Sequence, residues 1–124
     1  MASYQLKVLT EFASAHTLRD YPGACSRMHG HNWKVETEVE AVALDDTGMG
    51  VDFKQMKVAA NEVGDRLDHR YLNDIEPFDK VNPTAENIAA YMFREISAKL
   101  NSETVTVKAV TLWETDRACV RYSE

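Results

Sequence analysis

The sequence predicts an α+β fold in which two amphipathic helices cover one face of a four-stranded antiparallel sheet. Three observations support this prediction. Residues 4–16 and 29–44 alternate between apolar and polar side chains as strands do, residues 52–100 carry two apolar stripes at helical spacing, and residues 104–122 resemble a Val- and Thr-rich hairpin. The predicted order is therefore β-β-α-α-β-β. With 124 residues and neither an internal repeat nor a linker, the chain is expected to form a single domain over residues 1–124.

The first two strands are predicted over Tyr4 to Ala15 and about His31 to Leu44. Even positions of the first strand and odd positions of the second form mostly apolar faces, because successive side chains of a strand point to opposite sides. The turn Asp45-Asp46-Thr47-Gly48 ends the second strand. Between the strands, residues 17–28 contain the turn signal Asp20-Tyr21-Pro22-Gly23 and form a long loop, and such loops are often functional.

Each predicted helix has a capping signal and an apolar stripe. The first begins near Asp52, where Gln55 completes a capping-box pattern. The second opens with Asn82 or Thr84 as its cap and with Pro83 in its first turn. The stripes that we expect in the core are Phe53, Met56, Ala60, Val63 and Leu67 in the first helix and Ile88, Tyr91, Met92, Ile96 and Leu100 in the second.

The last predicted element is a hairpin. It runs from Thr104 to Glu114, turns at Thr115-Asp116-Arg117 and returns over Ala118 to Tyr122. A small antiparallel sheet with long strands leaves exposed edges, which can pair with a second copy of the chain. We therefore expect a homo-oligomer.

Charge and cysteine content narrow the class of protein. The formal net charge of −6 argues against nucleic acid and anionic membranes as partners, because both favour clustered Lys and Arg. No apolar run approaches the ~20 residues of a membrane span. Residues 1–7 alternate like a strand, so we expect no signal peptide. Cys25 and Cys119 without such a signal predict reduced thiols and a cytoplasmic protein.

Three of the four histidines, His16, His29 and His31, indicate a metal site. His29 and His31 point to the same side of their strand, and His16 lies in phase with the apolar face of its own strand. If these strands pair antiparallel, the three imidazoles meet at one edge of the core. A lone His-x-His is usually an ordinary surface or core feature, but three imidazoles with one open position are typical of catalytic zinc. We expect Zn²⁺, although imidazole also suits iron, nickel and copper.

Cys25 lies four residues before His29, in the predicted loop. A nearby divalent cation would favour its thiolate, which could then be a fourth ligand, a nucleophile or a general base. Cys119 lies inside a predicted strand, where a cysteine is ordinarily a small buried hydrophobe.

Asp68 and His69 at the end of the first predicted helix form a second candidate group. Such a pair is usually only a polar helix end. His69 is, however, the one histidine left for proton transfer near neutral pH, and Asp68 could orient it. Glu114 would by default be a solvated strand terminus, and its residue type alone does not single it out.

Six segments of the chain match the motifs of a known family. They are Phe12-Ala13-Ser14-Ala15-His16, Cys25-Ser26-Arg27-Met28-His29-Gly30-His31-Asn32, Gly50-Val51-Asp52-Phe53, Leu67-Asp68-His69-Arg70-Tyr71-Leu72-Asn73, Asn82-Pro83-Thr84-Ala85-Glu86-Asn87 and Glu114-Thr115. In this order they resemble the 6-pyruvoyltetrahydropterin synthase family over essentially the whole chain. The three-residue gap between Cys25 and His29 is similar to that of the bacterial 6-carboxy-5,6,7,8-tetrahydropterin synthases of queuosine biosynthesis, whereas the animal pyruvoyl enzymes have a longer gap.

The resemblance implies the tunnelling fold (T-fold), in which subunits join sheet edge to sheet edge around a central barrel. It implies a homohexamer, a dimer of trimers, with active sites at the subunit interfaces. It implies three zinc ligands, His16, His29 and His31. It implies four catalytic residues: Cys25 as the proton acceptor, Asp68 and His69 from a neighbouring subunit, and Glu114. For binding the pterin triphosphate it implies Glu114, Thr84, Glu86 and Arg27.

The implied reaction converts 7,8-dihydroneopterin triphosphate to 6-carboxy-5,6,7,8-tetrahydropterin and releases acetaldehyde and triphosphate. Zinc would serve as a Lewis acid, while Cys25 and His69 would move protons. Three alternatives stay open: a 6-pyruvoyltetrahydropterin synthase that stops after triphosphate elimination and isomerisation, a zinc hydrolase, and a structural zinc-binding module in which Cys25 is a fourth ligand.

Overall fold

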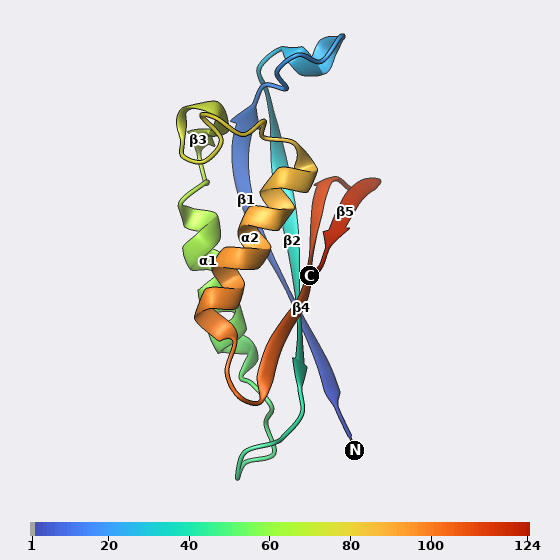
Figure 1. The fold of residues 1–124 in the computed structure, drawn as a ribbon, viewed down its shortest axis with the longest axis vertical. Helices are drawn as coiled ribbons and strands as arrows, with labels where there is room; N and C mark the ends of the chain where they lie inside the picture. Colours follow the sequence, from blue (N-terminus) through green and yellow to red (C-terminus); the bar gives the residue numbers. More distant parts are fainter. Residues whose placement is uncertain (1) are drawn as a thin grey trace.

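The computed structural model describes residues 2–124 as a twisted sheet with two helices packed side by side on one face (Figure 1). The strands lie in the order β3-β1-β2-β4-β5. Their bounds are Tyr4–His16 for β1, His29–Ala41 for β2, Arg70–Tyr71 for β3, Val105–Thr115 for β4 and Ala118–Tyr122 for β5. The helices are α1, Phe53–Asp65, and α2, Ala85–Leu100. The predicted α+β fold is therefore confirmed, with one additional strand.

The additional strand, β3, runs parallel to β1 and pairs with it at Ser14 and Ala15. The pairs β1–β2, β2–β4 and β4–β5 are antiparallel, as predicted. The backbone amide of His69 donates to the carbonyl of Ala13, which brings the chain that follows α1 alongside β1. A two-residue strand is too short to show an alternating pattern, so it could not be predicted from the sequence.

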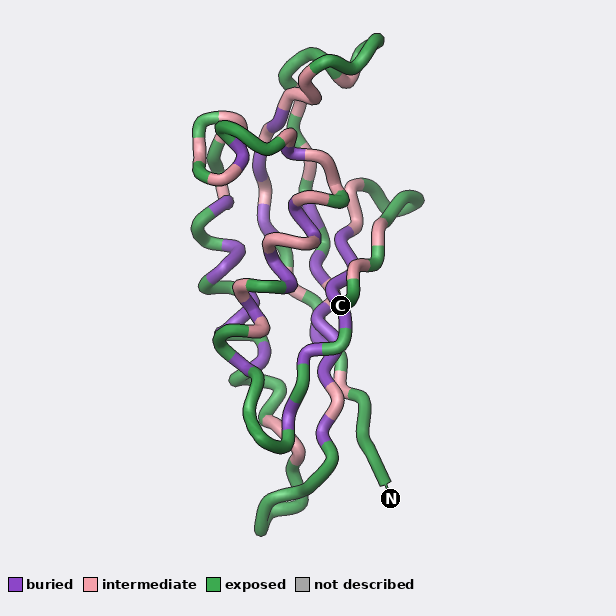
Figure 2. Tube along the Cα trace, in the orientation of Figure 1, coloured by how far each residue is buried: buried purple, intermediate pink, exposed green. Residues whose placement is uncertain are grey.

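The core lies between the sheet and the helices, where buried positions of both layers face each other (Figure 2). The helical stripes point into it as predicted, apart from Phe53 and the half-buried Tyr91. Its largest fully buried side chains include Trp33, Phe78, Met56, Leu67, Leu72, Ile88, Met92, Ile96 and Leu112. In the described part of the chain, neither helix is long and apolar enough to cross a membrane.

Two predicted core positions are exposed. Phe53 is 54% exposed because it is the first residue of α1, where it borders a surface groove together with Leu9 of β1. Cys119 is exposed because β5 is an edge strand. The cap of α1 is confirmed, since the Asp52 carboxylate accepts a hydrogen bond from the Lys54 amide at 2.8 Å.

Glu38 is buried, although its position in β2 predicts the polar face. Its carboxylate accepts hydrogen bonds from the guanidinium of Arg121 at 3.0 and 3.3 Å, and the ammonium of Lys7 lies 3.8 Å away. The Arg121 hydrogen bond holds the pKa of Glu38 below its usual value, more strongly than burial raises it. The sheet face without helices therefore has an ion-pair cluster across β1, β2 and β5.

The strand and helix ends that position the candidate site differ slightly from the predictions. β1 extends to His16 and β2 already begins at His29, so both strands include their histidines, while β2 ends at Ala41. Of the two predicted caps for α2, Thr84 is the one used, because its hydroxyl accepts from the Asn87 amide at 3.1 Å. Pro83 precedes this cap and is buried.

Candidate metal centre

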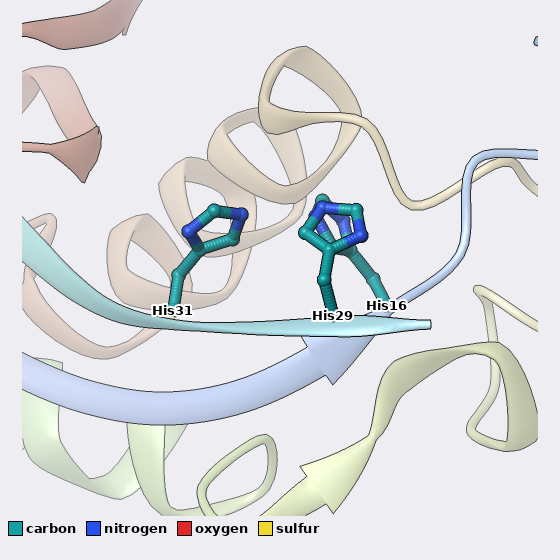
Figure 3. A group of neighbouring side chains, drawn as sticks. All are labelled: His16, His29 and His31. Atoms are coloured by element: carbon teal, nitrogen blue, oxygen red, sulfur yellow. The ribbon is translucent and has the colours of Figure 1, made fainter. Parts of the chain in front are cut away.

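The three histidines predicted to bind metal converge at the paired ends of β1 and β2 (Figure 3). His16, the last residue of β1, is the register partner of His29, the first residue of β2. His31 lies two residues further on and points to the same face. One ring nitrogen of each histidine lies within 4.8 Å of the other two, so the group is positioned to hold a metal ion.

Backbone carbonyls orient two of these rings. The Nδ1–H of His16 donates to the carbonyl of Pro83, and that of His29 donates to the carbonyl of Arg27, both at 2.7 Å. Because a carbonyl can only accept, each bond fixes the proton on Nδ1 and leaves the Nε2 lone pair free. This is the arrangement in which a second hydrogen bond sets the ring orientation of a metal-binding histidine.

The environment favours the neutral form of two of the imidazoles, those of His16 and His31. Burial lowers the pKa of His16; the bond to Pro83 opposes this effect, and the neighbouring His29 and His31 add to it. Burial also lowers the pKa of His31, against the opposing effect of the Glu114 carboxylate. Neutral imidazole is the form that binds metal.

The buried nitrogens of the site also fit a metal. The Nε2 atoms of His16 and His31 are buried, and neither has a hydrogen-bond partner among the described residues. A buried polar atom without a partner is costly, and a metal ion at the centre of the group would satisfy both nitrogens. Trp33 packs its ring against His16 and His31, with centroids 5.2 and 5.1 Å apart, and so forms an apolar floor. Three nitrogen ligands suit Zn²⁺ with an open fourth position.

Glu114 lies directly beside this centre. Its Oε1 is 3.4 Å from Nε2 of His31, without the geometry of a hydrogen bond, and its side chain is 32% exposed. The pairing of β2 with β4 brings it there, because Trp113 is the register partner of Lys34. Residue type alone did not identify Glu114, whereas the register of these two strands would have identified it.

Cys25 lies outside the group of convergent ligand atoms in the described chain. It is half-buried in a short 3-10 helix, Ala24–Ser26, within the loop that projects beyond the β1 and β2 ends in Figure 1. The same loop returns to the metal centre through Arg27, whose side chain is exposed and whose carbonyl orients His29.

Asp68 and His69 form a hydrogen-bonded pair at the β1 edge of the sheet. The His69 Nδ1 lies 2.8 Å from one carboxylate oxygen of Asp68, and the other oxygen accepts from the Ala13 amide at 2.8 Å. The Ala13 bond, followed by the His69 bond, lowers the pKa of Asp68. The His69 ring is 83% exposed and lies outside the group of three imidazoles. Asp68 therefore holds the His69 ring in a defined orientation, and that ring is exposed to solvent.

Thr84 and Glu86 lie at the start of α2, just after Pro83 in the sequence. Thr84 directly follows Pro83, whose carbonyl orients His16. Glu86 is exposed in the first turn of the helix. The start of α2 thus borders the ring of His16 on the side where β1 ends.

Comparison with known proteins gives a consistent result. The model of the family described as 6-pyruvoyl tetrahydropterin synthase matches residues 5–124. A 6-carboxy-5,6,7,8-tetrahydropterin synthase of a Synechocystis species is 36% identical over 117 residues, which cover 90% of this chain and 86% of the relative. One of Bacillus subtilis is 34% identical over 105 residues, covering 81% and 70%. The structure of Caenorhabditis elegans 6-pyruvoyl tetrahydropterin synthase superimposes with a TM-score of 0.86 at 27% identity, covering 100% of this chain and 97% of that one.

Proposed function

Because the chain belongs to the 6-pyruvoyl tetrahydropterin synthase family, we propose that it converts 7,8-dihydroneopterin triphosphate to 6-carboxy-5,6,7,8-tetrahydropterin, with release of acetaldehyde and triphosphate. The observation that carries the proposal is the convergence of His16, His29 and His31 beside Glu114. Identity does not separate the two products, since relatives named for the carboxy product are 34–36% identical and a Caenorhabditis elegans relative named for 6-pyruvoyl tetrahydrobiopterin synthase is 38% identical. The carboxy product is favoured by the three-residue gap between Cys25 and His29.

His16, His29 and His31 would hold a zinc ion through their Nε2 atoms. A bound zinc ion supplies Lewis-acid chemistry to an oxygen-bearing substrate. The neutral state of His16 and His31 and their buried, unpartnered nitrogens support this assignment. The bonds from His16 to Pro83 and from His29 to Arg27 would keep the rings aimed at the ion.

Glu114 would bind the pterin ring. An ionised carboxylate only accepts hydrogen bonds, and the amino and ring N–H groups of a pterin are donors. Its position 3.4 Å from His31 would hold the pterin side chain over the metal centre. Thr84 and Glu86 would line the pocket at the start of α2, and the exposed Arg27 would contact the triphosphate.

Cys25 would remove a proton from the substrate side chain, and His69 would return one elsewhere on it. The Asp68 carboxylate would keep His69 oriented through their 2.8 Å contact. Because His69 is presented outward at the edge of the sheet, we infer that it completes the site of a neighbouring subunit.

The free edges of the sheet support such an assembly. β3 covers β1 only at Ser14 and Ala15, so the edge of β1 from Tyr4 to Phe12 lacks a partner strand in the described chain, as does the outer edge of β5. The exposed Leu9 and Phe53 lie beside the β1 edge. We propose pairing of these edges between subunits in a hexamer built as a dimer of trimers. The two free cysteines fit a reducing, cytoplasmic setting.

Incubation of the zinc-loaded protein with dihydroneopterin triphosphate, followed by mass analysis of the product, tests the proposal. The carboxy product supports it, and a pyruvoyl product would assign the chain to the activity for which its structural relative is named. Cys25→Ala should lose nearly all activity while zinc stays bound. A zinc hydrolase would keep most of its activity in this variant, and a structural zinc module would lose its fourth ligand.

A further inference from the structure

Two asparagine side chains bind the start of the loop that carries Cys25. The amide of Asn73 accepts from the backbone N–H of Thr17 at 2.8 Å and donates to the carbonyl of the same residue at 2.9 Å. Asn82 does the same to Arg19, at 2.9 and 3.3 Å. Each side-chain amide thus satisfies both backbone groups of one loop residue, as a neighbouring strand would.

These bonds act on the backbone of Cys25 through Leu18. Leu18 lies between the two bound residues, and its N–H donates to the carbonyl of Cys25 at 3.0 Å. With Thr17 and Arg19 both fixed, the direction of the Leu18 N–H is fixed as well. The position of Cys25 therefore depends on both asparagines through a single hydrogen bond.

The segment that supplies the asparagines is itself organised around Arg19. The guanidinium of Arg19 donates to the carbonyl of Phe78 at 2.7 Å and, more weakly, to those of Asn73 and Val81 at 3.4 Å each. Charge-assisted hydrogen bonds of this kind are stronger than neutral ones. The loop start and residues 73–82 therefore stabilise each other as one unit.

This unit connects the other parts of the candidate site. Asn82 precedes Pro83, which orients His16, and Asn73 follows four residues after His69. Thr17 directly follows His16. The asparagines are thus attached to segments whose places are already set by the metal centre and by the Asp68–His69 pair.

We propose that Asn73 and Asn82 are positioning residues that set the place of the Cys25 thiol relative to the metal centre. The inference rests on the proposed role of Cys25 in proton removal. Loss of Asn73 would remove the two hydrogen bonds that hold the backbone of Thr17, and loss of Asn82 would remove the two that hold Arg19. In either case the thiol would spend less time in the reactive position.

Asn73→Asp and Asn82→Asp test this inference in the full chain. Each variant keeps the acceptor for the loop N–H but sets a carboxylate oxygen against the loop carbonyl. Asn101→Asp is the matched control, because Asn101 also accepts a backbone bond, from Val107 at 2.7 Å, but at the end of α2 distant from the loop in Figure 1. All proteins would carry Cys119→Ser, which leaves Cys25 as the sole thiol.

The readouts are zinc content, the rate of Cys25 alkylation by iodoacetamide, and kcat and KM for dihydroneopterin triphosphate. For the loop variants we expect zinc to be retained, alkylation to rise about tenfold and kcat to fall about tenfold with little change in KM, because one hydrogen bond to the loop carbonyl is replaced by repulsion between a carboxylate and that carbonyl. Asn101→Asp keeps the bond from Val107 but places a carboxylate at the C-terminal end of α2, where the helix dipole disfavours negative charge. It should lower the midpoint of thermal unfolding slightly and leave alkylation and kcat unchanged.

Unchanged alkylation in both loop variants, or an equal rise in Asn101→Asp, overturns the inference. If an aspartate variant does not fold, Asn73→Ala and Asn82→Ala remove both bonds of each asparagine without adding charge and are judged by the same criteria. An unmutated protein without synthase activity refutes the proposed function instead, and the alkylation rates then decide the positioning inference alone.

Discussion

Zinc should raise the thermal stability of this chain strongly, and the rise should depend on His16 but not on His69. The reason lies in the two buried Nε2 atoms, of His16 and His31, that lack partners within the described chain. Metal binding satisfies both atoms in the folded state only. Ligands that bind the folded state alone stabilise it by mass action.

The size of the effect follows from these two atoms. A buried polar atom without a partner costs about 1–3 kcal/mol, so metal at both nitrogens should raise the free energy of unfolding by about 2–6 kcal/mol. An unfolding entropy of about 2.1 cal/mol/K per residue, over 124 residues, converts this range to a rise of about 8–23 °C in the unfolding midpoint.

The assay is thermal unfolding, followed by circular dichroism, of chelator-treated and zinc-loaded protein at one protein concentration. His16→Ala should lose most of the zinc-dependent rise. His69→Ala is the control and should keep the full rise, because that ring is 83% exposed and outside the imidazole group. A rise of equal size in His16→Ala and the unmutated protein would refute the reasoning, as would its loss in His69→Ala.

Three further predictions concern charge, assembly and substrate binding. Glu38→Gln should lower stability at pH 7 by about 1 kcal/mol, measured as a urea midpoint. Arg121 depresses the pKa of Glu38 in the folded state, so the stabilisation by Glu38 is complete above the usual carboxyl pKa and is lost as the pH falls through the lowered value. The variant should therefore be as stable as the unmutated protein in strong acid. A stability difference that stays constant at every pH would contradict this prediction. His16→Ala and His69→Ala chains should each be inactive alone. If each site takes its metal ligands from one subunit and His69 from another, co-expression of the two variants should restore about a quarter of the activity, because a quarter of the randomly formed sites then have both residues. Mixed oligomers without activity would exclude such a shared site. Glu114→Gln should lower kcat/KM about 10- to 100-fold with zinc retained, whereas loss of zinc in this variant would indicate that Glu114 acts on the metal centre instead.

Most of the metal centre could be predicted from the sequence because strand periodicity is a local property. His29 and His31 share a face on any strand, and His16 lies in phase with the apolar face of β1. Only the antiparallel pairing of these two strands had to be assumed. The structure confirms the pairing and adds its register, in which His16 lies opposite His29.

Features that depend on contacts between distant segments could not be predicted from the sequence. β3 exists because His69 bonds to Ala13, and the burial of Glu38 depends on Arg121 reaching across the sheet from β5. Glu114 reaches His31 only through the β2–β4 register. Each of these features joins residues more than fifty positions apart, where local pattern carries no information.

The pairing of His16 with His29 has a consequence for how this architecture can diversify. A metal ion held by the last residue of β1 and the first residue of β2 would act as a cross-link at the mouth of the hairpin. Insertions or deletions around the tip of the intervening segment, residues 20–24, would then lie beyond the cross-link and leave the ligand geometry and Cys25 itself in place. A change in the sequence of that tip would then alter substrate preference without changing the three metal ligands.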